Sequence, residues 1–202
     1  MAELLSFFNE NLREAGCDEA GRGCMAGPVV AASVILPSDF HHKLLDDSKK
    51  TTEKSRLVLR EIIEKEAISW NVQFISPEKI DEINILNASI LGMQQAALQL
   101  EPKPEFVIID GNRFHAFEIP HKCFIKGDGK FKSIAAASIL AKTHRDEFME
   151  KIHAEFPEYN WNKNKGYPTL DHRKTIIKIG LSPYHRKTFH LKNVEQLELN
   201  FD

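Results

Sequence analysis

The stretch GCDEAGRGCMAGPVV, residues 16–30, joins two apolar runs through a glycine-rich turn. The second run, GPVVAASVIL at 27–36, is rich in β-branched residues and predicts a buried strand. The first run predicts a shorter strand that ends at Cys17 or Asp18. The two strands are expected to pair as a hairpin, with the carboxylates of Asp18 and Glu19 beside its turn.

Successive residues of a strand point to opposite faces of a sheet, which constrains Asp18 and Glu19. The two carboxylates can share one site only if the chain leaves regular strand geometry at this point. The glycines that follow permit such a departure, because glycine adopts backbone conformations that other residues avoid. We therefore expect strand geometry to break at Asp18 and Glu19.

Beyond the hairpin, helical and strand patterns alternate along the chain. Capping signals mark helix starts, as where Ser76 is followed by Pro77. The expected elements are a helix from Thr51 or Thr52 to about Ala67, a strand at 68–75, a short helix from Ser76, a helix from Asn84 or Asn87 to Leu100, strands at 105–111 and 121–129, and a helix at 132–156. This order predicts an α/β fold with a mixed sheet flanked by helices.

One domain is expected for the whole chain. Its 202 residues, 42% of them hydrophobic, suffice for a single core, and no repeat or linker divides them. We expect an α/β core at 14–157, a basic helical substrate-binding subregion at 158–192 and a tail at 193–202. Between Asn162 and Lys192 the chain has Lys or Arg at 163, 165, 173, 174, 178, 186, 187 and 192 against Asp171 alone, although its formal net charge is only −2.

Cysteine content and hydropathy indicate the cellular environment. The cysteines, Cys17, Cys24 and Cys123, form no CxxC pair, and their odd number fits neither a disulfide framework nor a zinc ribbon. The N-terminal apolar run is too short for a signal peptide, and no later segment reaches the length of a membrane span. We expect a soluble, monomeric, cytoplasmic protein.

Three aspartates each follow an apolar run and precede a glycine-bearing turn: Asp18 in CDEAG, Asp110 in IIDGN and Asp128 in KGDGK. One such aspartate is more often a turn former than a ligand, but sites gather at strand ends in α/β sheets. Clustered carboxylates without a matching Cys or His pattern favour Mg²⁺ or Mn²⁺. Two such ions can promote hydrolysis of a phosphodiester.

Six blocks of the sequence resemble ribonuclease HII, a type 2 ribonuclease H. They are DEAGRG (18–23), DSKK (47–50), IDGN (109–112), KGD with SIAAASILAK (126–142), GYPT (166–169) and SPYHRKTF (182–189), and they span about residues 15–190. The resemblance implies a ribonuclease-H-like fold and an endonuclease that cuts the RNA strand of RNA–DNA hybrids. It also implies cleavage 5′ to single ribonucleotides in duplex DNA, leaving 3′-hydroxyl and 5′-phosphate ends.

The resemblance further implies roles for residues of this chain. The catalytic carboxylates that would hold two divalent ions, Mn²⁺ or Mg²⁺, are Asp18, Glu19, Asp110 and Asp128. Gly21, Arg22 and Gly23 match the motif that reads the ribose 2′-hydroxyl largely through main-chain groups. Tyr167 matches the tyrosine that packs on the sugar of the next deoxynucleotide, and Lys49, Arg186 and Lys187 are expected to contact phosphates.

The chain departs from the family pattern at few positions. Ala20 stands where valine is common, and HRKTF replaces a frequent HRRSF. Gly129 stands where alanine or serine usually follows the fourth carboxylate, and it could loosen the loop of Asp128.

Three other interpretations stay open from the sequence. Ribonuclease HIII would require a further N-terminal domain before the first motif. A catalytically inactive nucleic-acid-binding module of the same fold would require the loss of a carboxylate. A structural metal-binding protein would leave the Gly-Arg-Gly turn and the tyrosine unexplained.

The tail contains QLELNF, Gln196–Phe201. This segment is similar to the QLxLxF hexapeptides with which bacterial replication and repair proteins bind the sliding clamp. A sliding clamp is therefore a candidate partner, and the alternative is an apolar tail that folds back on the domain.

Overall fold

A computed structural model describes residues 4–46 and 52–189, and its centre is a five-stranded sheet in the order β3-β2-β1-β4-β5. The strands are β1 (Glu14–Ala20), β2 (Val29–Ile35), β3 (Ser69–Ile75), β4 (Phe106–Asp110) and β5 (His121–Phe124). β2 pairs antiparallel with β1 and β3, whereas β4 runs parallel to β1 and β5. The predicted hairpin and the predicted mixed sheet are confirmed.

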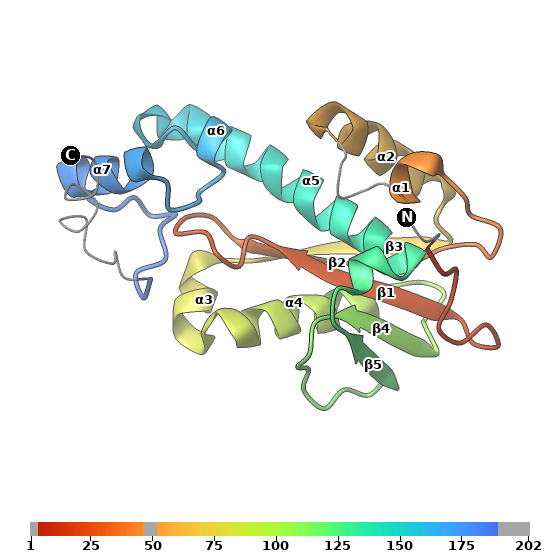
Figure 1. Cartoon of the computed structure of the whole chain (residues 1–202). Coiled ribbons are helices and arrows are strands. Elements are labelled where there is room, and N and C mark those ends of the chain that lie inside the picture. Colours follow the sequence, from red (N-terminus) through yellow and green to blue (C-terminus); the bar gives the residue numbers. More distant parts are fainter. Residues whose placement is uncertain (1–3, 47–51, 190–202) are drawn as a thin grey trace, which may run out of the picture.

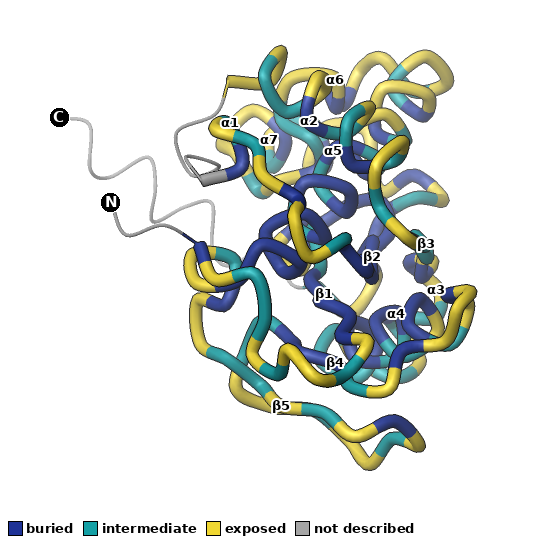
Figure 2. Tube along the Cα trace, turned by 90° about the vertical axis from the view of Figure 1, so that its right-hand side faces the viewer, coloured by how far each residue is buried: buried dark blue, intermediate teal, exposed yellow. Residues whose placement is uncertain are grey.

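Helices cover both faces of the sheet (Figure 1). One face carries α1 (Lys43–Asp46), α2 (Glu53–Glu66) and the long α5 (Lys132–Glu155), and the other carries α3 (Pro77–Ile83) and α4 (Ile85–Leu98). Residues of β2 alternate between these layers: Ala32 and Val34 pack toward α5, while Ala31 and Ile35 pack toward α4. Figure 2 shows β1 and β2 buried at the centre and β5 partly exposed at the edge.

Short-range capping fixes the starts of three helices. The side-chain oxygens of Thr52 and Ser76 accept hydrogen bonds from amides in the first turns of α2 and α3. Asn84, with a φ of 65°, ends α3 and caps α4 with its side chain. Thr52 and Asn84 are therefore the caps among the predicted alternatives, and α4 ends at Leu98 rather than at Leu100.

β1 is longer than predicted. It continues past Cys17 and Asp18 to Ala20 and pairs with β2 up to that residue. The predicted break in strand geometry at Asp18 and Glu19 is therefore wrong, because pairing with β2 keeps both residues in the strand. On its other side β1 loses its neighbour sooner, since its pairing with β4 ends at Cys17.

Asp128 does not end a strand, contrary to the prediction. β5 stops at Phe124, and Asp128 lies in a 3₁₀ turn, Gly127–Gly129 (η2), just before α5. The Gly127 carbonyl accepts hydrogen bonds from the amides of Lys130 and Phe131. These bonds lead the chain directly from the 3₁₀ turn into α5.

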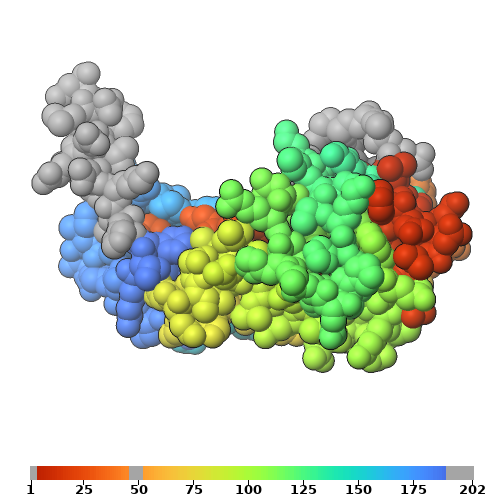
Figure 3. Space-filling view, turned by 90° about the horizontal axis from the view of Figure 1, so that it is seen from below, coloured from red at the N-terminus to blue at the C-terminus, as the bar shows by residue number. Residues whose placement is uncertain are grey.

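The C-terminal part of the described chain is helical, as predicted, and lies at one end of α5 (Figure 1). It contains a 3₁₀ turn, Pro157–Tyr159 (η3), α6 (Trp161–Asn164) and α7 (Leu170–Ile179). Figure 3 shows its last described residues against α3, where the Asp81 carboxylate accepts hydrogen bonds from the amides of Lys187 and Thr188. Within the described ranges no helix is long and apolar enough to cross a membrane.

α5 and β1 touch main chain to main chain at Gly16. A Cβ atom at Gly16 would collide with backbone atoms of Ser133 and Ile134 in α5. Backbone atoms in a packed core cannot move aside as the end of a flexible side chain can. The missing side chain of Gly16 therefore fixes the distance between the helix and the strand.

Gly16→Ala is expected to destabilise the fold. The added methyl group must push α5 away from β1, and overpacking of this kind costs about 1–3 kcal/mol. Gly23→Ala is the control, because a Cβ at Gly23 would have only Tyr167 near it, at 4.0 Å. Urea unfolding should give a lower free energy of unfolding for Gly16→Ala than for the control, and equal values would contradict the proposed contact.

Candidate active site

One open hollow at the carboxyl end of β4 is lined by all four carboxylates that the sequence singled out. Its walls are formed by Asp18, Glu19, Asp110, Gly111, Asn112, Ile125, Lys126 and Asp128. Asp110 is the last residue of β4, and Asp128 comes from the neighbouring η2. The structure thus brings together side chains from three separate segments.

Asp18 and Glu19 reach the hollow from opposite faces of β1. Asp18 lies on the side of α5, where Ser138 hydrogen bonds its carboxylate. Glu19 lies on the side that α4 covers, opposite Ala31 in β2. Both sides open into one space because β1 has no β4 partner beyond Cys17. The end of a strand pairing, rather than a break in the strand, lets adjacent residues share the site.

The carboxylates are shielded from water and close to one another. Asp18 is 7% exposed, and burial, followed by the charges of Glu19 and Asp110, raises its pKa well above the usual range. Burial also raises the pKa of Glu19, although Arg22 opposes the shift through an ion pair of 3.1 Å between Nη1 and Oε1. Burial is the largest cause of both shifts, so the ionised carboxylates are poorly solvated in the site.

This donor set fits a hard divalent cation. All the candidate ligands are carboxylates, and the second oxygen of Glu19, Oε2, is buried without a hydrogen-bond partner. A cation would satisfy that oxygen and offset the burial and the carboxylate repulsion that raise the pKa values. Among residues 4–46 and 52–189, no three His, Cys, Asp or Glu side chains are already grouped as a metal site. The carboxylates would therefore have to turn toward an ion to bind it.

Asp110 also holds the loop that carries Asp128. Its Oδ1 accepts a hydrogen bond of 2.6 Å from the Gly127 amide. This bond joins the end of β4 to η2. The relative position of Asp110 and Asp128 depends on it.

Two buried arginines hold the turn that follows β1. Arg186 is 1% exposed, and its guanidinium donates to the carbonyl oxygens of Gly21, Arg22 and Gly27 at 2.8, 3.1 and 3.0 Å. Arg145 of α5 is equally buried and donates to three further carbonyl oxygens, those of Ala26, Pro28 and Lys165, at 3.1, 3.0 and 2.9 Å. These bonds fix the path of the turn from behind.

The position of Arg186 does not fit the predicted contact with phosphate, because all three of its guanidinium nitrogens are engaged by the main chain. A basic run in a sequence suggests a solvated surface, so this burial was not foreseen. The sequence reasoning also missed Arg145. Its available signal is its place in the buried stripe of α5, four residues from both Ala141 and Met149.

Tyr167 lies beside the turn. Its side chain hydrogen bonds Cys24, and its ring is the nearest group to the Cβ position of Gly23, at 4.0 Å. Its carbonyl oxygen accepts a hydrogen bond of 2.9 Å from Nδ1 of His172, a buried histidine that lies 3.1 Å from His185 between Nε2 atoms. The Tyr167 residue remains 44% exposed.

Of the other two predicted phosphate contacts, one lies in the described residues and one does not. Lys187 is exposed, and its amide is bound by Asp81 of α3. Lys49 and the rest of the DSKK block lie outside the described residues, and so does the tail segment Gln196–Phe201.

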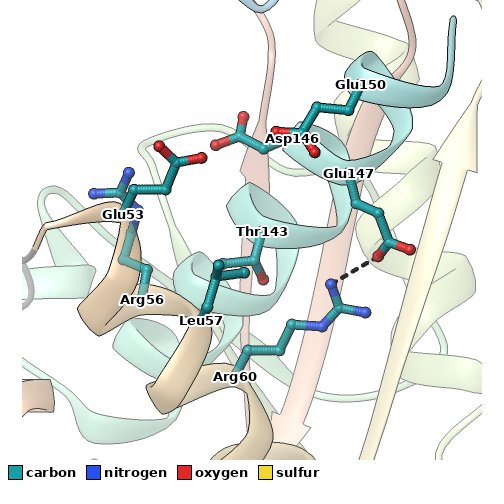
Figure 4. Close-up of a pocket in the computed structure, with 8 residues that line it drawn as sticks. All are labelled: Glu53, Arg56, Leu57, Arg60, Thr143, Asp146, Glu147 and Glu150. Atoms are coloured by element: carbon teal, nitrogen blue, oxygen red, sulfur yellow. Dashed lines mark hydrogen bonds and ion pairs between the residues drawn. The ribbon is translucent and has the colours of Figure 1, made fainter. Parts of the chain in front are cut away.

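A second pocket lies between α2 and α5 and shares no residue with the hollow (Figure 4). Arg60 pairs there with Glu64 at 2.7 Å and with Glu147 at 2.8 Å. The pair with Glu147 joins α2 to α5, whereas Glu64 lies on α2 itself. We assign the second pocket no catalytic role.

Comparison with known proteins agrees with this geometry. The family model for ribonuclease HII matches residues 15–192. A ribonuclease HII from Bacteroides thetaiotaomicron is 61% identical to this chain over 98% of its length and 100% of the relative's length. Full-length similarity of this degree favours ribonuclease HII over ribonuclease HIII.

Solved structures resemble the chain as well. The ribonuclease H2 of Pyrococcus horikoshii OT3 superposes with a TM-score of 0.74 at 26% identity, over 88% of this chain and 93% of that one. A chain from the PCNA:RNase HII complex of Archaeoglobus fulgidus gives a TM-score of 0.75 at 27% identity, over 92% of this chain and 100% of that one. The chain belongs to the ribonuclease HII family.

Proposed function

We propose that this metal-dependent ribonuclease H cuts 5′ to single ribonucleotides embedded in duplex DNA, as well as cutting the RNA strand of RNA–DNA hybrids, by a two-metal-ion mechanism. The products would carry 3′-hydroxyl and 5′-phosphate ends. The observation that carries the proposal is the position of the four carboxylates beside a turn that Arg145 and Arg186 hold from behind. Chemistry and recognition of the sugar would then share one hairpin.

In this proposal two divalent ions, Mg²⁺ or Mn²⁺, are held by Asp18, Glu19, Asp110 and Asp128. When bound, such ions activate a water molecule and stabilise the leaving oxygen of a phosphodiester. The chain supplies the ionised carboxylates and orients them toward the scissile phosphate. The raised pKa values of Asp18 and Glu19 support this role, because carboxylates that resist ionisation alone are stabilised when a cation binds.

The turn supports recognition of the ribose. Within the described chain, the amides of Arg22 and Gly23 donate to no backbone carbonyl, whereas the carbonyls of Gly21 and Arg22 are occupied by Arg186. Amide donors beside a residue without a side chain suit a 2′-hydroxyl, which can accept a hydrogen bond. Tyr167, exposed next to Gly23, would pack on the sugar of the following deoxynucleotide.

Exposed lysines, one of them in the lining of the hollow, would bind phosphates of the substrate. Lys126 lines the hollow and is exposed, and Lys187 is exposed beside α3. Lys49 stays a candidate on the sequence alone. Arg186 would contribute by fixing the turn rather than by touching the substrate.

A catalytically inactive binding module of the same fold is the alternative. Such a module would require the loss of a carboxylate, yet all four are present and all four line the hollow. We therefore favour the active enzyme, acting as a cytoplasmic monomer.

We also propose that Gln196–Phe201 binds a bacterial sliding clamp. The QLELNF sequence supports this partner. The relative from Archaeoglobus fulgidus, solved in complex with PCNA, gives a precedent in another family member.

A labelled duplex with one embedded ribonucleotide tests the proposed activity. It should be cut 5′ to the ribonucleotide in Mg²⁺ or Mn²⁺ and left intact in chelator. Asp18→Asn or Asp110→Asn should lower the single-turnover rate by several orders of magnitude with little change in duplex binding, because an amide lacks the charge that holds a divalent ion. Cleavage of an all-DNA control, or full activity of either variant, would overturn the proposal.

Gly23→Ala should impair cleavage at a single ribonucleotide without disturbing the fold. The added methyl group has free space around it, so it obstructs the substrate rather than the core. Gly21→Ala is a poorer test, because its Cβ would collide with Arg145 and its φ of 94° disfavours a side chain. The cleavage rate of the variant is compared with that of the unaltered protein. The thermal midpoint and Mn²⁺ binding are measured as controls. An unchanged cleavage rate would argue against recognition by the main chain.

Deletion of residues 195–202 should weaken binding to the sliding clamp of the same organism by about tenfold or more, because apolar anchors carry most of the affinity of a docking peptide. Leu197→Ala combined with Phe201→Ala should reproduce the loss, and Glu195→Ala is the control. Surface plasmon resonance measures the affinity, and cleavage of a short duplex reports the integrity of the enzyme. Equal affinity of the full and shortened chains would rule out this docking segment.

A further inference from the structure

The segment that precedes β1 packs along the loop that carries Asp128. The Leu5 amide donates a hydrogen bond of 2.8 Å to the Lys130 carbonyl, and the Lys132 amide donates one of 2.9 Å to the Leu5 carbonyl. Leu5 thereby forms a parallel bridge with Phe131. The proposed chemistry gives this contact no role, although it lies next to a candidate metal ligand in the chain.

An aromatic cluster anchors the same segment. The centroid of the Phe8 ring lies 5.9 Å from that of Phe106, 5.1 Å from that of Phe124 and 6.5 Å from that of Phe131. These three rings belong to β4, to β5 and to the residue that caps α5. Phe8 therefore packs on β5, which leads into the Asp128 loop, on the start of α5, which follows the loop, and on β4, which ends beside it. Nζ of Lys122 lies 4.3 Å from the centroid of Phe8 and adds a cation–π contact.

Glu14 ties the segment to β1. The residue is 2% exposed, and its two carboxylate oxygens accept hydrogen bonds of 3.0 Å each from the amides of Phe8 and Asn9. A buried carboxylate is costly unless it is hydrogen bonded, so these two bonds favour one path for the segment. Glu14 is also the first residue of the strand that carries Asp18.

The Asp128 loop is held by contacts outside it as well as by hydrogen bonds within it. Gly127 and Gly129 flank Asp128, and glycine loses more conformational freedom on ordering than any other residue. One anchor of the loop is the hydrogen bond from the Gly127 amide to Asp110. A second anchor is the pair of backbone hydrogen bonds to Leu5.

We propose that residues 4–14 act as a positioning strap, in which Leu5, Phe8 and Glu14 hold the Asp128 loop in place relative to β1 and β4. The strap touches neither the hollow nor the substrate and acts through the loop alone. The inference rests on the role proposed above for Asp128. It also accounts for Gly129, because outside contacts supply the stiffness that alanine or serine would give at that position.

Leu5→Pro and Phe8→Ala test the strap in two ways. Leu5→Pro removes the amide that donates to Lys130, and Leu5→Ala is its matched control because it keeps that amide and alters a residue that is 58% exposed. Phe8→Ala removes the anchoring ring. Phe74→Ala is its control, because Phe74 is 44% exposed against 41% for Phe8 and packs on a single ring, that of Phe148, at 5.8 Å.

Two measurements separate positioning from general stability. Hydrogen–deuterium exchange should become faster at residues 126–132 in Leu5→Pro and Phe8→Ala, while exchange in α4 and in both controls stays unchanged. Single-turnover cleavage of the one-ribonucleotide duplex, followed against Mn²⁺ concentration, should require about tenfold more Mn²⁺ for the half-maximal rate. Duplex binding in chelator should not change.

Unchanged exchange at residues 126–132, or a Mn²⁺ requirement equal to that of the controls, would overturn the strap whatever happens to the thermal midpoint. If Leu5→Pro does not fold, Phe8→Ala and its control decide the question. Failure of the proposed function has a different signature, because the unaltered protein would then not cleave the duplex. The exchange comparison would still show whether residues 4–14 hold the loop.

Discussion

The contact between Gly16 of β1 and the first turn of α5 determines where the candidate active site forms. Helix and strand meet there without an intervening side chain, and α5 then continues unbroken over Lys132–Glu155. Because a helix rises about 1.5 Å per residue, side chains along α5 lie at fixed distances from this contact. Ser138 thereby reaches Asp18, and Arg145 reaches the turn after β1. One helix therefore positions a carboxylate and the neighbouring turn together.

Opposite charges occupy opposite sides of the turn. The carboxylates open into the hollow, whereas Arg145 and Arg186 are buried behind the turn and donate to carbonyl oxygens. Burial lowers the pKa of Arg186 to about 10, which still leaves the group protonated at neutral pH. A buried guanidinium is tolerated only when its donors are satisfied, so the carbonyls of Gly21 and Arg22 stay directed toward it. The amides of Arg22 and Gly23, which donate to no backbone carbonyl in the described chain, are then left for solvent or for a ligand.

Features set by neighbouring residues could be predicted from the sequence, whereas features set by tertiary contacts could not. The hairpin and the helix caps at Thr52 and Asn84 depend on residues within a few positions of one another. The way in which Asp18 and Glu19 share the hollow depends on where β4 stops pairing with β1, and alternation along one strand cannot reveal this. The burial of Arg186 could not be predicted from the sequence either, because it results from the folding of the C-terminal segment against a turn far away in the sequence. The family pattern identified the residue, but only the fold shows that it supports the turn.

The β1–β2 hairpin joins charge and recognition through the covalent chain. Glu19 and Gly21 are two positions apart, so at most about 7 Å of extended backbone separates a carboxylate of the hollow from the turn. This spacing cannot change without loss of the pairing between Ala20 and β2. Glu19 belongs to both the turn and the hollow. Its Oε1 binds Arg22 of the turn, while its Oε2 is buried without a hydrogen-bond partner. In the proposed enzyme, the phosphodiester to be cut and the ribose to be read are therefore kept in register by the backbone of a single hairpin.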